Sequence, residues 1–163
     1  ASVGGIRRDL GPGVIVVPDQ IVDYTWGRAT TFFEGAGSRV THIDFTHPYS
    51  AKMRVRLLAA ARAAGENAVD GGVYAATQGP RLETAAEINR MERDGADLVG
   101  MTGMPEAALA RELELEYAAI AVVANYAAGR GESEHGIPMQ RIETVLEEAM
   151  GRVRLIIDRL VQQ

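Results

Sequence analysis

Three apolar runs of the sequence end in polar residues that are suited to holding a small molecule. The motif TQGPRLET begins at Thr77, MTGMPE begins at Met101, and NYAAG begins at Asn125. An amide such as Asn125 is both donor and acceptor, which suits recognition of a ring amide in a ligand. If these strand ends are neighbours, they form a largely apolar pocket with a few hydrogen-bonding groups, the usual make-up of a small-molecule site. Its candidate residues are Leu82, Glu83, Met101, Thr102, Asn125 and Tyr126.

Two of these polar residues have a second, purely structural interpretation. Thr102 stands before Gly103 and Pro105 at the mouth of an expected helix, where a hydroxyl and free backbone amides can hold an anion such as phosphate. The same position suits a simple helix cap. Asn125 can read a ligand, but Asn also favours turns. Spacing alone leaves both alternatives open.

The sequence lacks the motifs of several other chemistries. Its three histidines are scattered and do not have the paired spacing of a zinc site, so we expect no metal. It contains no phosphate-binding P-loop, no GxGxxG and no GxSxG nucleophile elbow. We therefore expect a site that works by binding and positioning its substrates, without a covalent intermediate.

The elements that must position these residues alternate between strands and amphipathic helices. The run from 117 to 124 has no alternation, which is typical of a strand buried on both faces, and it places Asn125 at that strand's carboxyl end. The pattern indicates a single domain over residues 1–163, of α/β class, with three layers around a central mixed sheet. We expect a loop leaving a strand at 1–5 and a long loop at 19–37. The expected strands are 14–17, 39–45, 69–77, 97–101 and 117–124, and the helices 50–64, 84–93, 105–114 and one from Pro138.

Composition narrows the class of partner. The net charge is -5 and the basic residues are scattered, which argues against a nucleic-acid partner. No apolar stretch approaches the roughly 18 residues of a membrane span, so we expect no membrane partner. The sequence has no cysteine, which fits a cytoplasmic protein without disulfides.

Longer motifs in a fixed order resemble a known family. They are GGIRRDLGPGVIVVPDQIVDYT, TQGPRLET and VGMTGMPEAALARELELEYAAIAVVANYAAG. Together they resemble the trimeric branch of the purine nucleoside phosphorylase and methylthioadenosine phosphorylase family, from Ala1 to about Val161. Members are about half as long again, so the resemblance implies a phosphorylase-like fold that lacks its N-terminal strands ahead of Ala1.

The resemblance implies reversible phosphorolysis of a nucleoside. Inorganic phosphate attacks the anomeric carbon as the purine leaves through an oxocarbenium-like transition state, and no cofactor is needed besides phosphate as co-substrate. By motif, Ala1, Ser2 and Thr102 would contact phosphate, and Met101 would lie against the ribose. Leu82 stands where methylthioadenosine enzymes have a Phe on the purine, and Glu83 follows at a position linked to substrate choice.

The departure from the family pattern lies at Asn125 to Ala127. Members that accept adenine have two Asp residues at the positions matching Asn125 and Ala127, on either side of Tyr126, and here both carboxylates are absent. Asn125 can donate to a 6-oxo group or to a purine ring nitrogen as charge builds, so it is the catalytic candidate. A buried Asp facing a carbonyl oxygen would be repulsive, and hypoxanthine is therefore favoured over adenine.

The resemblance also assigns the sugar end of the substrate. Met139 and Ile142 match apolar positions that line a methylthio pocket, although both are equally suited to the buried face of the last helix. His42 matches a residue that reaches the site of a neighbouring subunit, which implies a homotrimer. A position within a core strand is the alternative for His42.

Our first hypothesis is phosphorolysis of S-methyl-5'-thioinosine to hypoxanthine and 5-methylthioribose 1-phosphate, a purine salvage reaction. A close alternative keeps the fold and acts on methylthioadenosine or on 6-oxopurine nucleosides in general. An alternative of another class is a nucleoside-binding fragment without turnover, because the family's phosphate loop and its phosphate-binding Arg-His pair lie in the portion ahead of Ala1.

Overall fold

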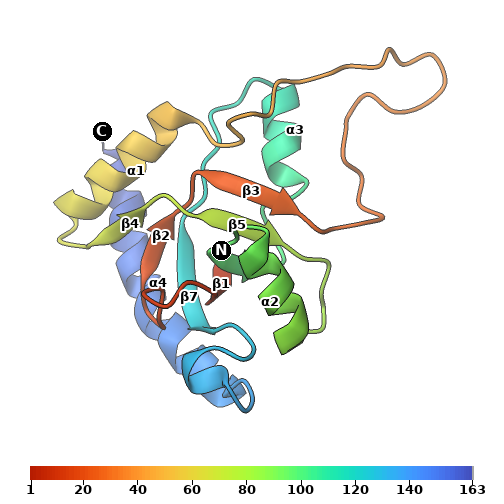
Figure 1. Cartoon of the computed structure of the whole chain (residues 1–163). Coiled ribbons are helices and arrows are strands. Elements are labelled where there is room, and N and C mark those ends of the chain that lie inside the picture. The colour runs from red at the N-terminus through yellow and green to blue at the C-terminus, as the bar shows by residue number, and fades with distance from the viewer. Residues whose placement is uncertain (163) are drawn as a thin grey trace.

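The computed structural model describes residues 1–162 and contains one mixed sheet of seven strands in the order β3-β5-β6-β1-β7-β2-β4 (Figure 1). A short 3-10 turn, η1, spans Gly131–Ser133. The strands are β1 (Ser2–Gly5), β2 (Ile15–Val17), β3 (Gln20–Asp23), β4 (Ala68–Asp70), β5 (Val73–Ala76), β6 (Leu98–Gly100) and β7 (Ala121–Tyr126). The α/β class and the mixed sheet expected from the sequence are confirmed.

Strand direction changes where the sheet meets its central pair. Strands β3, β5 and β6 are parallel to one another, β1 pairs antiparallel with β6, and β7 is parallel to β1. The carboxyl ends of β6 and β7 therefore lie at opposite edges of the sheet. The carboxyl ends of β5 and β6 are neighbours, whereas that of β7 lies at the opposite edge, so a site that joins all three strands must lie across a face.

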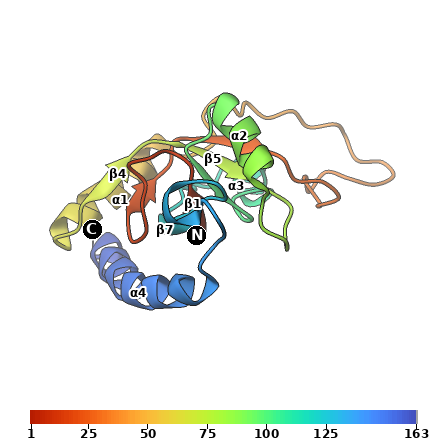
Figure 2. The same cartoon turned by 60° about the horizontal axis from the view of Figure 1, so that its bottom comes forward.

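Helices cover both faces of the sheet, which is curled (Figure 2). They are α1 (Ala51–Ala63), α2 (Ala85–Arg93), α3 (Glu106–Glu112) and α4 (Met139–Val161). Each lies close to its expected range because the sequence carries clear start signals. The Ser50 hydroxyl accepts from the Met53 amide, and Thr84 forms a capping box with Glu87. Within residues 1–162, no helix combines the length and apolar character needed to cross a membrane.

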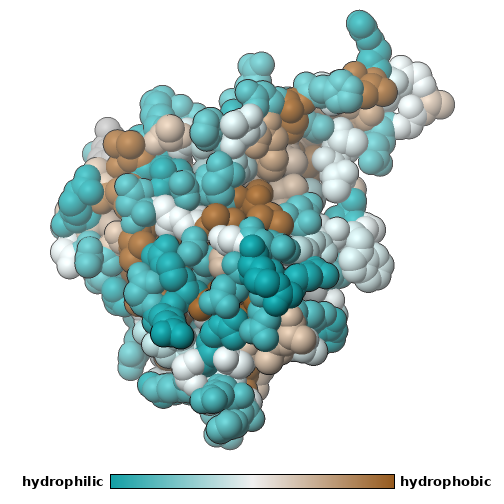
Figure 3. Space-filling view, in the orientation of Figure 1, coloured by the Kyte–Doolittle hydropathy of each residue, from teal (hydrophilic) through white to brown (hydrophobic). Residues whose placement is uncertain are grey.

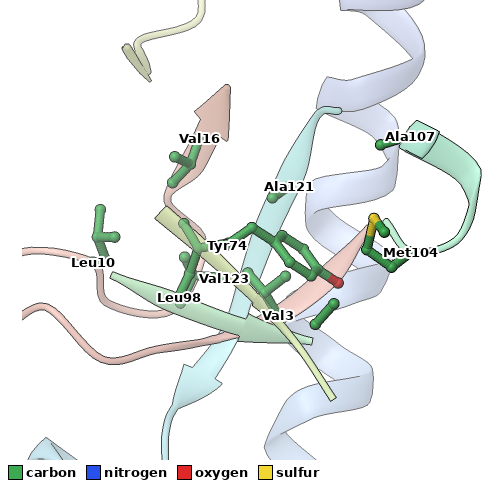
Figure 4. Packing of buried hydrophobic residues seen from close by; sticks show 10 residues of the cluster. Val3, Leu10, Val16, Tyr74, Leu98, Met104, Ala107, Ala121 and Val123 are labelled. Carbon is green, nitrogen blue, oxygen red and sulfur yellow. The ribbon is translucent and has the colours of Figure 1, made fainter. Parts of the chain in front are cut away.

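One face of the sheet, which we call the filled face, packs large side chains against α3. Tyr74 is fully buried at its centre, with Val3, Leu98 and Val123 from neighbouring strands and Met104 near its ring (Figure 4). Residues that alternate with these point to the opposite face. There Ile15, Val17 and Val122 pack on α1 and α4, while Ala75 and Val99 pack on α2.

Several sequence-based boundaries are wrong, for local reasons. The run 69–77 is two strands because Gly71 and Gly72 adopt φ of 91° and 129°, which turns the chain between β4 and β5. Residues Ser2–Gly5 form a strand between β6 and β7, where a loop was expected. β3 lies inside the expected loop 19–37, and the expected strand 39–45 is irregular. The residues of that segment find no neighbouring strand with which to pair.

Residues 24–50 form a long segment without helix or strand, part of which projects from the body (Figures 1 and 3). It carries exposed apolar side chains: Trp26 is 72% exposed, Phe32 56% and Val40 82%. Arg28 fastens its root, because its guanidinium donates to the carbonyls of Thr77 and Gln78, each at 3.2 Å, and to that of Met104. The projecting segment is thus tied to the loops that follow β5 and β6.

Candidate functional site

A cavity of about 340 Å³ lies over the face opposite the filled face, and we call it the central cavity. Its size is within the range of small-molecule sites. Its floor follows one row across three strands, in which Gly4 pairs with both Val99 and Asn125. Most of its lining is apolar. Among the residues named in advance, it brings together Ser2, Leu82, Glu83, Met101, Thr102, Asn125, Ala127, Met139 and Ile142.

A bulge in β7 turns Asn125 toward this cavity. Val3 and Gly4 are consecutive in β1, yet they pair with Val123 and Asn125, so that Ala124 is an extra residue in β7. Side chains alternate along a strand, and Val123 points to the filled face. Without the bulge, Asn125 would point there as well, whereas the extra residue re-aims it to the cavity side. The expectation that this strand ends at Ala124 is wrong, because β7 continues to Tyr126.

The Asn125 amide is half-buried, and one of its N–H groups donates to the Tyr126 carbonyl at 2.6 Å. This bond holds the side chain while leaving a second N–H and the amide oxygen for a ligand. Tyr126 itself does not line the cavity. Its ring lies on the other side of the strand, close to Gly11 and Gly131. Tyr126 therefore does not belong with the residues that face the ligand.

The loop after β5 forms one wall of the central cavity. Leu82 is 39% exposed, and the half-buried Glu83 lines both this cavity and a neighbouring one of about 280 Å³. The Thr77 hydroxyl donates to Glu83 Oε1 at 2.7 Å. Arg81 pairs with Glu87, and together with the Thr84 amide it lowers the pKa of Glu87 to about 2. Leu82 and Glu83 are therefore carried by a loop that is held at each end.

The opposite wall comes from α4 and the residues before it. Met139 and Ile142 lie in the first turn of α4 and line the central cavity with Ile137. Met139 is 60% exposed, so much of its side chain is free to contact a ligand. Farther along the same helix, Ala149, Val153 and Ile156 are buried against the sheet. The start of α4 thus faces the cavity, and the rest of the helix supports it.

Thr102 is held in place by a buried tyrosine. The Thr102 amide donates to the Tyr74 hydroxyl at 3.2 Å, and the two hydroxyl oxygens lie 3.2 Å apart. Burial raises the pKa of Tyr74, which keeps its hydroxyl protonated. If that proton goes to Thr102 Oγ1, the Thr102 hydroxyl can donate its own proton to an anion.

The expectation of free amides beside Thr102 is wrong. The Gly103 amide donates to Glu106 Oε2 at 2.9 Å, so the carboxylate of α3 occupies it. Ala1 does not line the central cavity but lies, with Thr102 and Glu106, against an adjoining hollow. Burial and Glu106 raise the pKa of Tyr117, whose hydroxyl donates to the same carboxylate. Of the three phosphate candidates named from the sequence, Ser2 and Thr102 therefore line the central cavity and Ala1 does not.

His42 is not among the residues that line the central cavity and is exposed on the projecting segment. The alternative that it sits in a core strand is wrong, because no strand forms there. Within residues 1–162, no group of three or more His, Cys, Asp or Glu side chains is placed to hold a metal ion.

Sequence reasoning missed several residues that shape the site. Gly4, Val99 and Ala128 line the cavity, and Thr77 braces Glu83. A Cβ at Gly4 would lie 3.3 Å from Val99 Cγ1 and 3.4 Å from Ala127 Cα, so the floor needs glycine to stay open. The pair Gly4-Gly5 is the one signal in the sequence that marks a close backbone approach.

The chain matches the family model of the phosphorylase superfamily over residues 1–162. It is 57% identical over 155 residues to a probable S-methyl-5'-thioinosine phosphorylase of Xanthomonas campestris, covering 95% of this chain and 62% of that protein. A protein of the same description from Pseudomonas syringae is 58% identical over 160 residues, covering 98% and 64%. The chain therefore spans somewhat less than two thirds of the length of these curated relatives.

More distant relatives differ in their described substrate. A probable 6-oxopurine nucleoside phosphorylase of Thermococcus kodakarensis is 40% identical over 167 residues, covering 99% of this chain and 62% of that protein. Among solved structures, an adenosine/methylthioadenosine phosphorylase double mutant of Schistosoma mansoni in complex with adenine superposes with a TM-score of 0.93. Its identity is 30%, and the match covers 99% of this chain and 64% of that chain.

Proposed function

Because the chain belongs to the phosphorylase superfamily, we propose that the protein containing it cleaves S-methyl-5'-thioinosine with phosphate. The products are hypoxanthine and 5-methylthioribose 1-phosphate, a step of purine salvage. The observation that carries this proposal is the lining of the central cavity. The lining includes the amide of Asn125, and the apolar side chains of Met139 and Ile142 form one of its walls. The relatives from Xanthomonas and Pseudomonas support the same substrate.

The reaction transfers a pentose from a purine to phosphate. A phosphate oxygen forms a bond to the anomeric carbon as the glycosidic bond breaks, and the electron pair of that bond goes to the purine. Asn125 has an N–H group free to stabilise the negative charge that develops on the leaving base. Thr102 and Ser2 line the cavity and supply hydroxyls for phosphate. The site acts mainly by orienting two substrates.

The sugar wall favours a thioether over a hydroxyl. Met139, Ile142 and Ile137 offer no hydrogen-bond partner from their side chains, so a 5'-hydroxyl buried there would lose its bond to water. A methylthio group gains apolar and sulfur contacts in the same place. Met101, which also lines the cavity, is assigned to the ribose.

The test is a substrate panel with the natural full-length protein. Methylthioinosine, methylthioadenosine and inosine are each supplied with phosphate, and release of the free base is measured. We expect kcat/KM to be highest for methylthioinosine. Met139→Gln should shift preference toward inosine, and Gln140→Ala, a change at the exposed neighbouring position of α4, serves as its control. Preference for methylthioadenosine would contradict the assignment of Asn125.

A general 6-oxopurine nucleoside phosphorylase is the second candidate. It is favoured by the Thermococcus relative and by the exposure of Met139, which leaves the sugar wall open on one side. Equal kcat/KM for inosine and methylthioinosine would select this candidate. If the full-length protein binds purine but releases no base from any of the three nucleosides, the non-catalytic alternative is selected.

We also propose that the active form is a homotrimer in which His42 reaches the site of a neighbouring copy. The exposed apolar side chains of the projecting segment, Trp26, Phe32, Phe33 and Val40, support a role in assembly, since such surface is normally covered. Light scattering should give three times the mass of one chain, and a monomer would contradict the proposal. His42→Ala should lower activity without dissociating the trimer.

Two further properties belong to this proposal. Inorganic phosphate serves as co-substrate and no other cofactor takes part, so dialysis against a chelator should leave activity unchanged. The absence of cysteine supports a cytoplasmic location, because that compartment disfavours disulfides. Cell fractionation that recovers the protein in a membrane or extracellular fraction would contradict it.

A further inference from the structure

Thr77 is a buried polar residue that the proposed chemistry leaves without a role. Its side chain follows β5, is 7% exposed, and lies behind the wall of the central cavity. Its amide donates to the Gly100 carbonyl at 2.8 Å, which fixes its backbone against β6. Its hydroxyl lies 2.7 Å from Glu83 Oε1 and 3.2 Å from the Gly100 carbonyl.

The single proton of this hydroxyl can be given to one acceptor at a time. The Gly100 carbonyl already accepts the Thr77 amide, and the carboxylate is both nearer and charged, so the proton goes to Glu83. Glu83 Oε1 is then occupied. Within residues 1–162, no hydrogen bond reaches Glu83 Oε2, which leaves that oxygen for a ligand.

A carboxylate fixed in this way distinguishes two classes of purine. A 6-oxopurine carries a ring N–H beside its oxo group, and an ionised oxygen can accept that proton. A 6-aminopurine has a lone pair at the same ring position, and a lone pair facing the carboxylate is repulsive. The discrimination depends on orientation, because a carboxylate free to rotate can turn away from the repulsion.

From this geometry we infer that Thr77 is a positioning residue for base selectivity: its hydroxyl fixes Glu83 so that the free carboxylate oxygen selects 6-oxopurines. The inference rests on the proposed function, because it concerns the purine that the central cavity takes. It adds a second determinant to Asn125, one that acts through another side chain.

The test is Thr77→Val in the natural full-length protein, a change that removes the hydroxyl and keeps the branched shape. We expect the ratio of kcat/KM for methylthioinosine over methylthioadenosine to fall about tenfold, the size expected for a hydrogen bond to a charged group. The fall should come from a higher KM for methylthioinosine, with the KM for phosphate unchanged. Thr77→Ser should restore both readouts.

Two controls separate this role from bracing of the loop. Thr84→Val removes the cap of α2 and loosens the same loop, yet it leaves the hydroxyl on Glu83, so selectivity should not change. In a Glu83→Gln background, Thr77→Val should have no further effect on selectivity, because the two residues act as one unit.

Equal losses of kcat/KM for both nucleosides in Thr77→Val, or additive effects with Glu83→Gln, would overturn the inference and leave the proposed function standing. Calorimetry with hypoxanthine gives a readout that needs no turnover. A wild-type protein that neither cleaves these nucleosides nor binds hypoxanthine would overturn the proposed function, and this inference with it.

Discussion

The two faces of the central strands differ in how they use their side chains. On the filled face, Tyr74, Leu98 and Val123 are fully buried and pack against one another in the core. On the cavity side, Gly4 of β1 and Ala127, which follows β7, border a space of about 340 Å³. This difference teaches that the cavity exists mainly because small residues leave space on that side of the sheet. A few polar groups stand at its walls.

The first prediction removes the bulge that separates the two faces. Inserting one glycine between Val3 and Gly4 gives Ala124 a partner in β1, and regular alternation after Val123 should then return Asn125 to the filled face, where its amide meets apolar neighbours. We expect purine binding to be lost and the free energy of unfolding to fall by at least about 3 kcal/mol. Calorimetry with hypoxanthine and denaturant unfolding measure the two effects.

Ala124→Gly is the matched control for this insertion. It keeps the number of residues in β1 and β7 and should cost only about 0.5–1 kcal/mol, with binding retained. Wild-type binding by the insertion variant would mean that the bulge does not orient Asn125.

The second prediction changes the charge at the cavity side alone. Asn125→Asp should move the preference from methylthioinosine toward methylthioadenosine by about 100-fold in the ratio of kcat/KM, or about 3 kcal/mol. The change is expected because a carboxylate repels a 6-oxo group and can accept from a 6-amino group. Stability should fall by about 1 kcal/mol, because a carboxylate cannot donate to the Tyr126 carbonyl as the amide does. Asn125→Ala, which should lower activity on both nucleosides, is the control, and an Asp variant that still prefers methylthioinosine would refute the assignment.

The third prediction connects the filled face to the cavity. Tyr74→Phe keeps the volume of the core and removes only the hydroxyl that contacts Thr102. We expect the KM for phosphate to rise by about three- to tenfold, because Thr102 loses its orienting partner, while the KM for the nucleoside stays the same. Steady-state kinetics at varied phosphate gives the measurement. Tyr117→Phe removes a hydroxyl that contacts Glu106 instead, and an equal rise in that variant would contradict a specific role for Tyr74.

The smallest predicted effect concerns Glu87, which pairs with Arg81 beside the loop that carries Leu82 and Glu83. The pKa of Glu87 is about 2, below its ordinary value of 4.5, because Arg81 and the Thr84 amide bind its ionised form. A carboxyl with a lowered pKa stabilises the fold above its unfolded pKa and loses this contribution as the pH falls toward 2. Glu87→Gln should therefore be slightly less stable than wild type at pH 7, and the difference should disappear near pH 2.

Thermal unfolding of wild type and Glu87→Gln across this pH range checks the prediction. Gln still completes the capping box, so the control for the cap itself is Thr84→Val. A stability difference that is constant with pH would show that the ion pair is not its source.

Local signals made the helices predictable. Ser50 and Thr84 cap α1 and α2 at the expected residues, and Gly65 and Gly95 follow their ends with positive φ. These signals act within a few residues of one another, so they can be read from one sequence. The α/β class was predictable as well, because these signals separate helices from strands that alternate along the chain.

Strand direction and the bulge were not predictable, because both depend on partners distant in the chain. Nothing near Ala124 distinguishes it from its apolar neighbours, and its extra place in β7 appears only when β1 pairs beside it. Much of the cavity lining was nevertheless named from the sequence, partly from the strand ends and partly by resemblance. Thr77 was not predicted, because its role depends on a hydrogen bond to Glu83 that forms only when the loop after β5 folds back.

Arg28 gives the projecting segment a consequence beyond assembly. Its guanidinium spans the loops after β5 and β6, which carry Leu82, Glu83, Met101 and Thr102 between them. A displacement of the segment would thereby reach the backbone that carries these cavity residues. In the proposed trimer, contact of a neighbouring copy with the segment would then change the shape of the central cavity, which couples assembly to the site.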